Sequence, residues 1–142
     1  KEEMKRVAQI SQSLEFIDKK EDGFGSPISQ GGTNVSGGQK QRLAIARAIA
    51  KNPEIYIFDD SFSALDFKTD AKLRKALKEY TKDSTILIVA QRISSIMNAD
   101  KIIVLEQGEV VGMGTHNELL KNCEVYKEIA SSQLGEEEIK NA

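Results

Sequence analysis

The sequence predicts an α/β fold in which a parallel sheet is flanked by helices. Three apolar segments, at residues 55–58, 85–89 and 101–105, have the length and the β-branched composition of strands. Helical patterns at residues 67–80 and 94–97 separate these segments. Strands that alternate with helices are typical of parallel sheets, whose ligands bind beyond the carboxyl ends of the strands.

A helical part precedes the sheet and is predicted to occupy residues 1–52. Residues 1–18 carry apolar side chains at the spacing of an amphipathic helix, namely Val7, Ile10, Leu14 and Ile17. Turn-forming residues predict a loop over residues 21–34. A second helix is expected to begin after Ser36 and to stop before Pro53, because the residue before a proline disfavours the helical conformation.

The remaining α/β part is predicted to occupy residues 53–134. Past the third strand, a turn at residues 107–109 predicts a hairpin. Thr115 and Glu118 stand at the spacing of a capping box, which predicts the start of a final helical region. Residues 135–142 are rich in glutamate, and we predict that they form a disordered tail.

Composition limits the function classes that the chain can serve. The 142 residues, of which 30% are charged and 39% hydrophobic, suit a small domain with a single core. A net charge of −2 gives no basic excess, so we expect no nucleic-acid partner. No apolar run approaches the roughly 20 residues of a membrane helix, so we expect no direct membrane insertion by this segment. The single cysteine, Cys123, fits a reducing compartment.

Two features of the sequence point to phosphate and magnesium chemistry. Ser36 can cap the helix that follows it, and Gly37 and Gly38 let backbone N–H groups approach an anion without a Cβ in the way. The strand at residues 55–58 leads into Asp59, at the end of the strand where ligands bind. Taken by itself, an aspartate in this position caps a turn more often than it holds a metal. The start of the helix is therefore a stronger indication of phosphate binding than Asp59 is of a metal site.

The order of these motifs resembles the ATPase domain of ATP-binding cassette (ABC) transporters. The segment Val35–Arg42 is similar to the signature motif of the family, Asp59 to its Walker B aspartate and the segment Ser63–Asp66 to its D-loop. The resemblance implies a P-loop NTPase-like core that binds ATP and Mg²⁺, with Asp59 holding the metal. It also implies that Asp66 and four signature residues contact an ATP molecule held by a partner cassette; the four are Ser36, Gly37, Gly38 and Gln39.

Further segments resemble the exporters of this family. The loop at residues 29–32 stands where exporters touch the coupling helices of the transmembrane domain, and residues 100–108 and 114–119 look like the end of an exporter cassette. The resemblance implies an ATP-binding subunit that couples ATP hydrolysis to the export of drugs, lipids or peptides. Such a subunit lies at the cytoplasmic face of the plasma or inner membrane, as part of an integral membrane transporter. In that analogy His116 is structural.

Two residues depart from the pattern of the hydrolytic members. Asp60 stands where those members have a glutamate that polarises the attacking water, and Gln91 stands where they have a histidine that contacts the γ-phosphate. The side chain of Asp60 is one methylene shorter, and Gln91 cannot carry positive charge. We therefore expect Asp60 and Gln91 to form a degenerate, slowly hydrolysing site. The partner would be a second cassette in a heterodimer, whose competent site this chain completes with its signature.

The family's phosphate-binding motif, G-x-x-x-x-G-K-[ST], does not occur in the 142 residues. The chain thus looks like the C-terminal part of a cassette and is expected to be inactive on its own. In the sheet of the family, a further strand lies between those matching residues 85–89 and 101–105, so we predict exposed apolar surface or a partner strand there. Two alternatives stay open: a soluble ABC ATPase of translation or DNA repair, and a non-hydrolytic interaction module.

Overall fold

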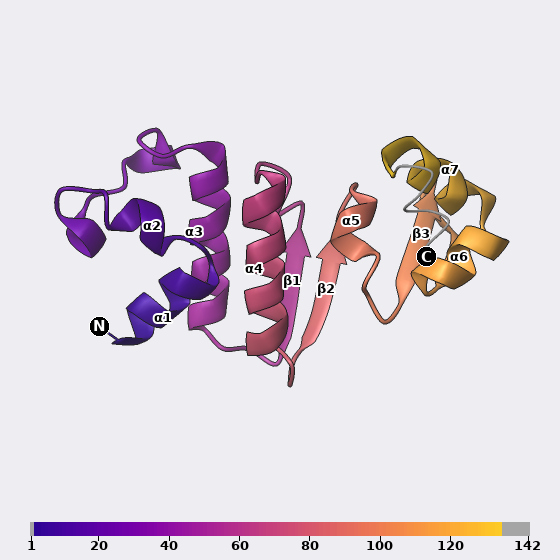
Figure 1. Ribbon diagram of the computed structural model, residues 1–142, viewed down its shortest axis with the longest axis horizontal. Coiled ribbons are helices and arrows are strands. Elements are labelled where there is room, and N and C mark those ends of the chain that lie inside the picture. The colour runs from indigo at the N-terminus through magenta and orange to yellow at the C-terminus, as the bar shows by residue number, and fades with distance from the viewer. Residues whose placement is uncertain (1, 135–142) are drawn as a thin grey trace. The chain divides into compact units, whose positions relative to one another are not determined.

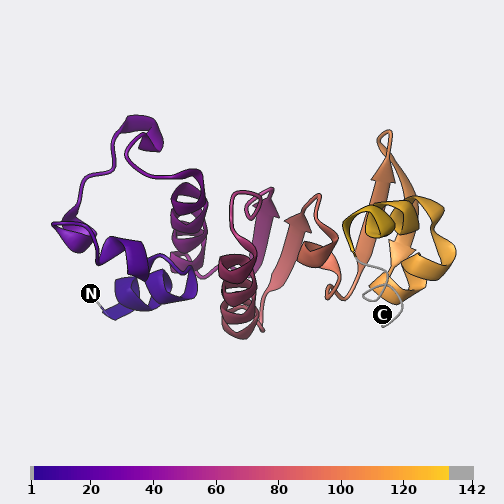
Figure 2. The ribbon, with the colours of Figure 1, turned by 45° about the horizontal axis from the view of Figure 1, so that its top comes forward.

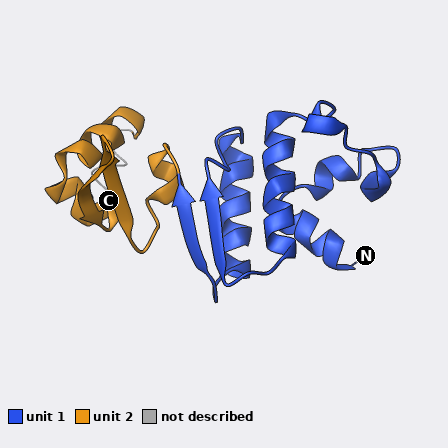
Figure 3. Ribbon diagram, turned by 180° about the vertical axis from the view of Figure 1, so that it is seen from behind, with its two compact units in different colours: residues 1–89 blue, residues 90–142 orange. Residues whose placement is uncertain are grey.

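The computed structural model describes residues 2–134, which divide into two compact units between Val89 and Ala90 (Figure 3). The first unit contains α1 (Glu2–Ile10), α2 (Leu14–Ile17), α3 (Gly37–Ala50), β1 (Ile55–Asp59), α4 (Phe67–Tyr80) and β2 (Thr85–Val89). The second contains α5 (Ile93–Ile96), β3 (Ile102–Glu106), β4 (Glu109–Gly114), α6 (His116–Asn122) and α7 (Glu124–Gln133). The predicted α/β fold with a parallel sheet flanked by helices is confirmed, and the predicted tail at residues 135–142 lies outside the described residues (Figure 1).

The parallel sheet of the first unit consists of β1 and β2. Ile55 lies opposite Thr85, and Asp59 lies opposite Val89, so both strands end together at their carboxyl ends. The two faces of this sheet differ, because the side chains of β1 alternate between buried and exposed. The bare face presents four large apolar side chains that are each more than half exposed, namely Ile55, Ile57, Leu87 and Val89. These four side chains give the first unit an exposed apolar face. The predicted apolar surface or partner strand at the position of a further strand beside β2 stays a prediction.

The other face of this sheet is covered by helices that come before and after residue 52 in the sequence. Tyr56 and Phe58 of β1 share one hydrophobic core with Ile45 of α3, Leu73 of α4 and Val7 of α1. The predicted division between residues 1–52 and 53–134 thus falls inside the first unit. Burying these side chains joins the helical part to the strands, and this packing holds the residues of the candidate site in place.

The first predicted helix is interrupted, and the prediction of one helix over residues 1–18 is wrong. α1 ends at Ile10, and the chain turns through Gln12, whose φ is 58°. The side chains of Ser11 and Ser13 are buried and 2.8 Å apart, and the Ser11 hydroxyl donates to the Ser13 hydroxyl. The Ser11 hydroxyl also lies 3.2 Å from the carbonyl of Ala8, and serine side chains compete with helical hydrogen bonds through such contacts to the backbone. Arg42 of α3 also stabilises this break, because its Nη1 donates to the carbonyl of Gln12 at 2.6 Å.

The loop between α2 and α3 is long, as predicted, and can be followed in Figure 2. It contains two single 3₁₀ turns, at Gly23–Gly25 and Gln30–Gly32. The side chain of Asn34 closes its second half, because Oδ1 accepts from the backbone N–H of Ser29 at 3.1 Å and Nδ2 donates to the carbonyl of Pro27 at 2.9 Å. The loop therefore reaches the signature in a fixed conformation.

The second unit contains an antiparallel hairpin with two short helices packed on it. β3 pairs with β4, so the predicted hairpin is confirmed, with an irregularity between Val104 and Leu105. The capping box of Thr115 and Glu118 is present, as predicted. The final helical region is two helices, α6 and α7, because Cys123 takes an extended conformation between them. Among residues 2–134, no helix combines the length and the apolar composition needed to cross a bilayer.

Candidate functional site

The start of α3 has the geometry of an anion-binding helix terminus. The Ser36 Oγ accepts a hydrogen bond from the backbone N–H of Gln39 at 3.2 Å, and the Gln39 side chain accepts from the backbone N–H of Ser36 at 3.0 Å. This capping box leaves the N–H groups of Gly37 and Gly38 without acceptors in the helix, since a helix cannot satisfy its own first donors. The Ser36 hydroxyl hydrogen is also available to donate, because the cap uses only its oxygen.

Gly38 has a packing role that the sequence did not reveal. A Cβ at this position would lie 2.9 Å from the carbonyl oxygen of Ala64, which is closer than a carbon atom can approach a backbone oxygen. Glycine therefore lets α3 pack directly against the backbone at Ala64. The structure thereby brings the predicted signature and the predicted D-loop together within the first unit.

Asp59 and Asp60 lie at the carboxyl end of β1, as predicted. Both residues are exposed. The backbone N–H of Asp60 donates to the carbonyl of Val89 at the end of β2, and its φ is 46°, in the left-handed region. Ser63 Oγ donates to the Asp60 carboxylate at 3.1 Å. The chain reverses sharply here, and the two neighbouring carboxylates occupy different positions at the strand end.

The residues at this strand end fit a magnesium ion that is shared with nucleotide phosphates. Mg²⁺ in such sites takes one or two carboxylates, together with water and phosphate oxygens. Within the described residues, no three His, Cys, Asp or Glu side chains gather as they would in an all-protein metal cage. One exposed carboxylate, that of Asp59, is therefore a suitable donor, whereas a structural metal with a full set of protein ligands does not fit.

The side chain of Asp66 caps the start of α4. Its carboxylate accepts from the Thr69 hydroxyl at 2.7 Å and from the Thr69 backbone N–H at 2.9 Å. These hydrogen bonds, the hydroxyl first, lower the pKa of the Asp66 carboxyl below its ordinary value. The carboxylate is exposed and charged at neutral pH, so it can also face a nucleotide.

Gln41 contacts the candidate site through hydrogen bonds that the sequence did not predict. Its amide bridges α3 to the segment that follows β1: Nε2 donates to the carbonyl of Asp60 at 3.0 Å and to Ser63 Oγ at 3.0 Å. Its Oε1 accepts from the backbone N–H of Ala64 at 2.8 Å. The spacing of Gly38 and Gln41 places both on one side of the helix, a signal that could have identified this contact.

Gln91 lies at the start of the second unit, whereas Asp60 belongs to the first. Gln91 is exposed. Its backbone carbonyl accepts a hydrogen bond from Gln133 Nε2 of α7 at 2.8 Å. Gln133 Oε1 in turn accepts from the backbone N–H of Ile93 at 2.8 Å. Gln133 thus fixes the backbone on both sides of Arg92. No local pattern indicates this role, because its partners are 40 and 42 residues away.

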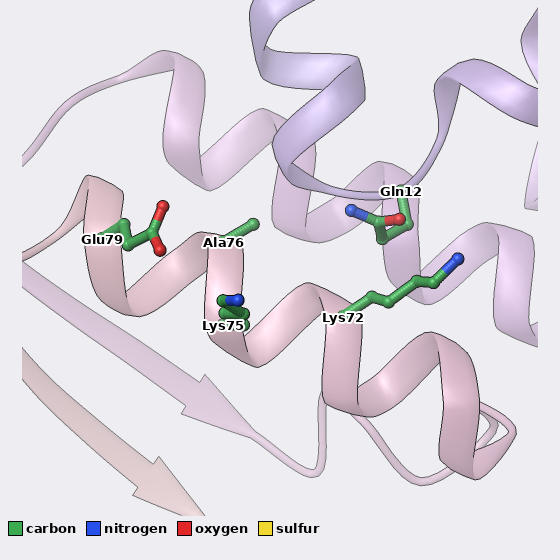
Figure 4. A pocket seen from close by; sticks show the side chains of 5 residues that line it. All are labelled: Gln12, Lys72, Lys75, Ala76 and Glu79. Atoms are coloured by element: carbon green, nitrogen blue, oxygen red, sulfur yellow. The ribbon is translucent and has the colours of Figure 1, made fainter.

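The hollows on the first unit lie apart from these site residues. One, of about 240 Å³, is lined by Gln12 and by side chains of α4, including Lys72 and Lys75 (Figure 4). Another, of about 320 Å³, lies between α3 and β1, with Ala44, Arg47 and Phe58 among its lining residues. Neither is lined by Ser36 or by the aspartates of the strand end. Ser36 and Gly37 are exposed and Gly38 is half-buried, so the start of α3 is accessible to a second molecule.

His116 is buried in the second unit and has a packing role. Its Nδ1 and the hydroxyl of Tyr126 share a hydrogen bond of 2.7 Å, and the two rings meet edge to face. Its Nε2 is buried without a hydrogen-bond partner among the described residues. Burial lowers the pKa of His116 below 6.5 and raises the pKa of Tyr126 to about 12. Both groups are therefore held in their neutral forms.

We expect acid to destabilise the second unit through His116. The unfolded chain binds a proton near pH 6.5, whereas the folded unit binds it only at lower pH, so stability falls as the pH drops from 6.5 towards the folded pKa. Thermal unfolding between pH 7.5 and 5.5 measures this loss. The variant His116→Gln keeps an acceptor for Tyr126 and should show a weaker pH dependence. An equal dependence in both proteins would contradict the assignment.

Comparison with known proteins places these features in one family. The family model described as ABC transporter matches residues 2–63. An uncharacterized ABC transporter ATP-binding protein of Mycobacterium tuberculosis is 48% identical over 132 residues, 93% of this chain and 22% of the relative. The ATP-dependent lipid A-core flippase of Aliivibrio fischeri is 40% identical over 134 residues, 94% of this chain and 23% of the relative.

A solved structure agrees with this assignment. The structure of a bacterial Atm1-family ABC exporter with ATP bound aligns with a TM-score of 0.90 and 34% identity, over 94% of this chain and 24% of that one. The chain spans about a quarter of the length of the relatives it matches. The capped signature helix, the aspartates after a parallel strand and these similarities agree, and the chain belongs to the ABC transporter family.

Proposed function

We propose that this chain is part of the ATP-binding subunit of an ABC-type exporter, which couples ATP binding and hydrolysis to the transport of drugs, lipids or peptides across a membrane. The observation that carries the proposal is the start of α3, where Ser36 and two glycines present free donors on an open surface. The similarity to an exporter with ATP bound supports it. The subunit would lie at the cytoplasmic face of the plasma or inner membrane, with the loop at residues 29–32 against the coupling helices of the transmembrane domain.

In this proposal the chain serves two ATP molecules. At the subunit's own site, Asp59 would hold Mg²⁺, and the metal would supply charge stabilisation to the phosphates. Asp60 orients the attacking water, and Gln91 donates a hydrogen bond towards the γ-phosphate. At the site held by the partner, the Ser36 hydroxyl and the N–H groups of Gly37 and Gly38 bind the phosphates. Gln39 and Asp66 complete that surface.

The two sites are proposed to be unequal, in a heterodimer with a second ABC cassette. Asp60 is shorter than the glutamate of hydrolytic members, and the hydrogen bond from Ser63 holds its carboxylate against its own loop. Gln91 cannot replace the charge of a histidine. ATP at this site would hold the dimer closed, while the site completed by Ser36 would turn over and reset it.

Catalysis by the complete transporter provides the test of this function. Reconstituted with its partner cassette and its transmembrane segments, the protein should bind ATP and hydrolyse it in a Mg²⁺-dependent manner, with loss of turnover in EDTA. The isolated 142-residue chain should hydrolyse none above background, because it lacks the phosphate-binding motif. The proposal fails if the complete transporter neither binds nor hydrolyses ATP.

A further inference from the structure

We propose that Gln41 is a positioning residue that couples the two ATP sites through this subunit. Gln41 lies on α3, and in the proposed function the start of this helix contacts the ATP held by the partner. The amide of Gln41 hydrogen-bonds residues that follow β1, the strand that ends in the proposed metal ligand Asp59. The inference rests on the proposed function, because it assigns each end of this contact to a different nucleotide. No other described side chain joins α3 to Asp60 by hydrogen bonds that the structure records.

The amide of Gln41 uses both of its polar atoms in this contact. Nε2 donates to two acceptors and Oε1 accepts from one donor, at distances of 2.8–3.0 Å. Ser63 Oγ then donates to the Asp60 carboxylate at 3.1 Å. Two hydrogen bonds therefore lead from α3 to the group that orients the attacking water. Glutamate could accept but not donate here, and asparagine is one methylene too short.

A second contact makes this connection stiff. Gly38 leaves no space between α3 and the carbonyl of Ala64, since even a Cβ would lie 2.9 Å from that oxygen. Ala64 is also the residue whose N–H binds Gln41. The helix α3 thus contacts both the carbonyl and the N–H of Ala64. A shift of α3 towards this segment would therefore move Ala64 as well.

The distance along the helix is short enough to transmit a displacement. Gln41 stands five residues after Ser36, about 7.5 Å along the axis of a rigid α-helix. When the phosphates of the partner's ATP engage Ser36, α3 is drawn towards them, and Gln41 carries Asp60 with it. Occupancy of the partner's site therefore changes the position of Asp60, and by reciprocity the nucleotide at this subunit's site changes affinity at the partner's site.

The test measures the coupling between the sites in the complete transporter. The affinity of this subunit's site for a fluorescent ATP analogue is determined with the partner's site filled and with it blocked, and the ratio of the two affinities is the coupling factor. Factors of about 5 to 150 are typical of coupled sites. In Gln41→Leu the ratio should fall to about one. Gln41→Glu, which keeps the acceptor and loses both donors, should also lower it and guards against a folding defect in the first variant.

Arg42→Leu supplies a matched control on the same helix. Arg42 donates to the carbonyls of Gln12 and Gly38 and lies over the ring of Phe16, and none of these contacts involves the segment after β1. Its loss should therefore lower the melting temperature and leave the coupling ratio unchanged. Hydrogen exchange in the nucleotide-free protein gives a second readout, since Gln41→Leu should expose the N–H of Ala64 and Arg42→Leu should not. A normal ratio in a Gln41→Leu protein that binds ATP at both sites would overturn the role of Gln41 alone. A complete transporter that binds no ATP would overturn the proposed function as well.

Discussion

Replacing Ser36 by arginine is expected to lower ATP turnover by the complete transporter by about a hundred- to a thousandfold, the cost of losing a preorganised donor at a reacting phosphate. The long side chain removes the hydroxyl and occupies the space in front of the N–H groups of Gly37 and Gly38. Steady-state ATP hydrolysis measures the effect. Because Ser36 serves the partner's ATP in the proposed function, the loss should appear at the partner's site, although the partner's own residues are unchanged.

The variant Ser36→Asp separates chemistry from folding. Aspartate is as good a helix cap as serine, so the start of α3 should stay intact. Its charge, however, repels the phosphates, and turnover should fall as far as in Ser36→Arg. The matched change Ser131→Arg, on the exposed surface of α7, should keep turnover near that of the unaltered protein. Normal hydrolysis in a folded Ser36→Asp protein would argue against donation of the signature to a partner.

Restoring Asp60→Glu and Gln91→His together is expected to raise hydrolysis at this subunit's own site by at least about a hundredfold. The longer carboxylate reaches the attacking water, and a displacement of about one ångström costs a factor of this size. The histidine adds a group that can carry positive charge beside the γ-phosphate. The number of hydrolysing sites should rise from one to two.

The measurement is cleanest in a Ser36→Asp background, where the partner's site is silent and the remaining turnover comes from the site of Asp60. Each single variant should recover part of the activity, and the double variant should recover most of it. Melting temperatures of all variants show whether the changes are tolerated. If the double variant hydrolyses no faster than its Ser36→Asp parent, the account of a degenerate site is wrong.

Local signals explain why much of the fold could be predicted from the sequence. The limits of α3 and α4 follow from Ser36 and Asp66, whose side chains cap the helices through hydrogen bonds to residues three positions away. The strands could be identified by composition and the hairpin by its turn. The α/β architecture and the family follow from these elements and from the order of the motifs.

The features that the sequence did not reveal depend on distant partners. The break after α1 is held by Arg42, which lies 30 residues from the carbonyl of Gln12. Gln41 reaches residues 19 to 23 positions away, and Gln133 reaches the backbone beside Gln91 across about twice that distance. Propensity and periodicity describe neighbours along the chain, so contacts that tertiary packing creates lie beyond them. The positioning residues of this site belong to that class.

The left-handed backbone at Asp60 also bears on the stability of the chain reversal after β1. Aspartate visits this conformation more readily than glutamate does, because its short side chain can hydrogen-bond locally. In the proposed function, two demands therefore meet at this position: fast turnover favours glutamate, whereas an unstrained chain reversal favours aspartate. A site that turns over slowly, as proposed here, would tolerate the second preference. Natural variation here would record a trade between catalysis and foldability, in which losing the glutamate brings a gain in stability.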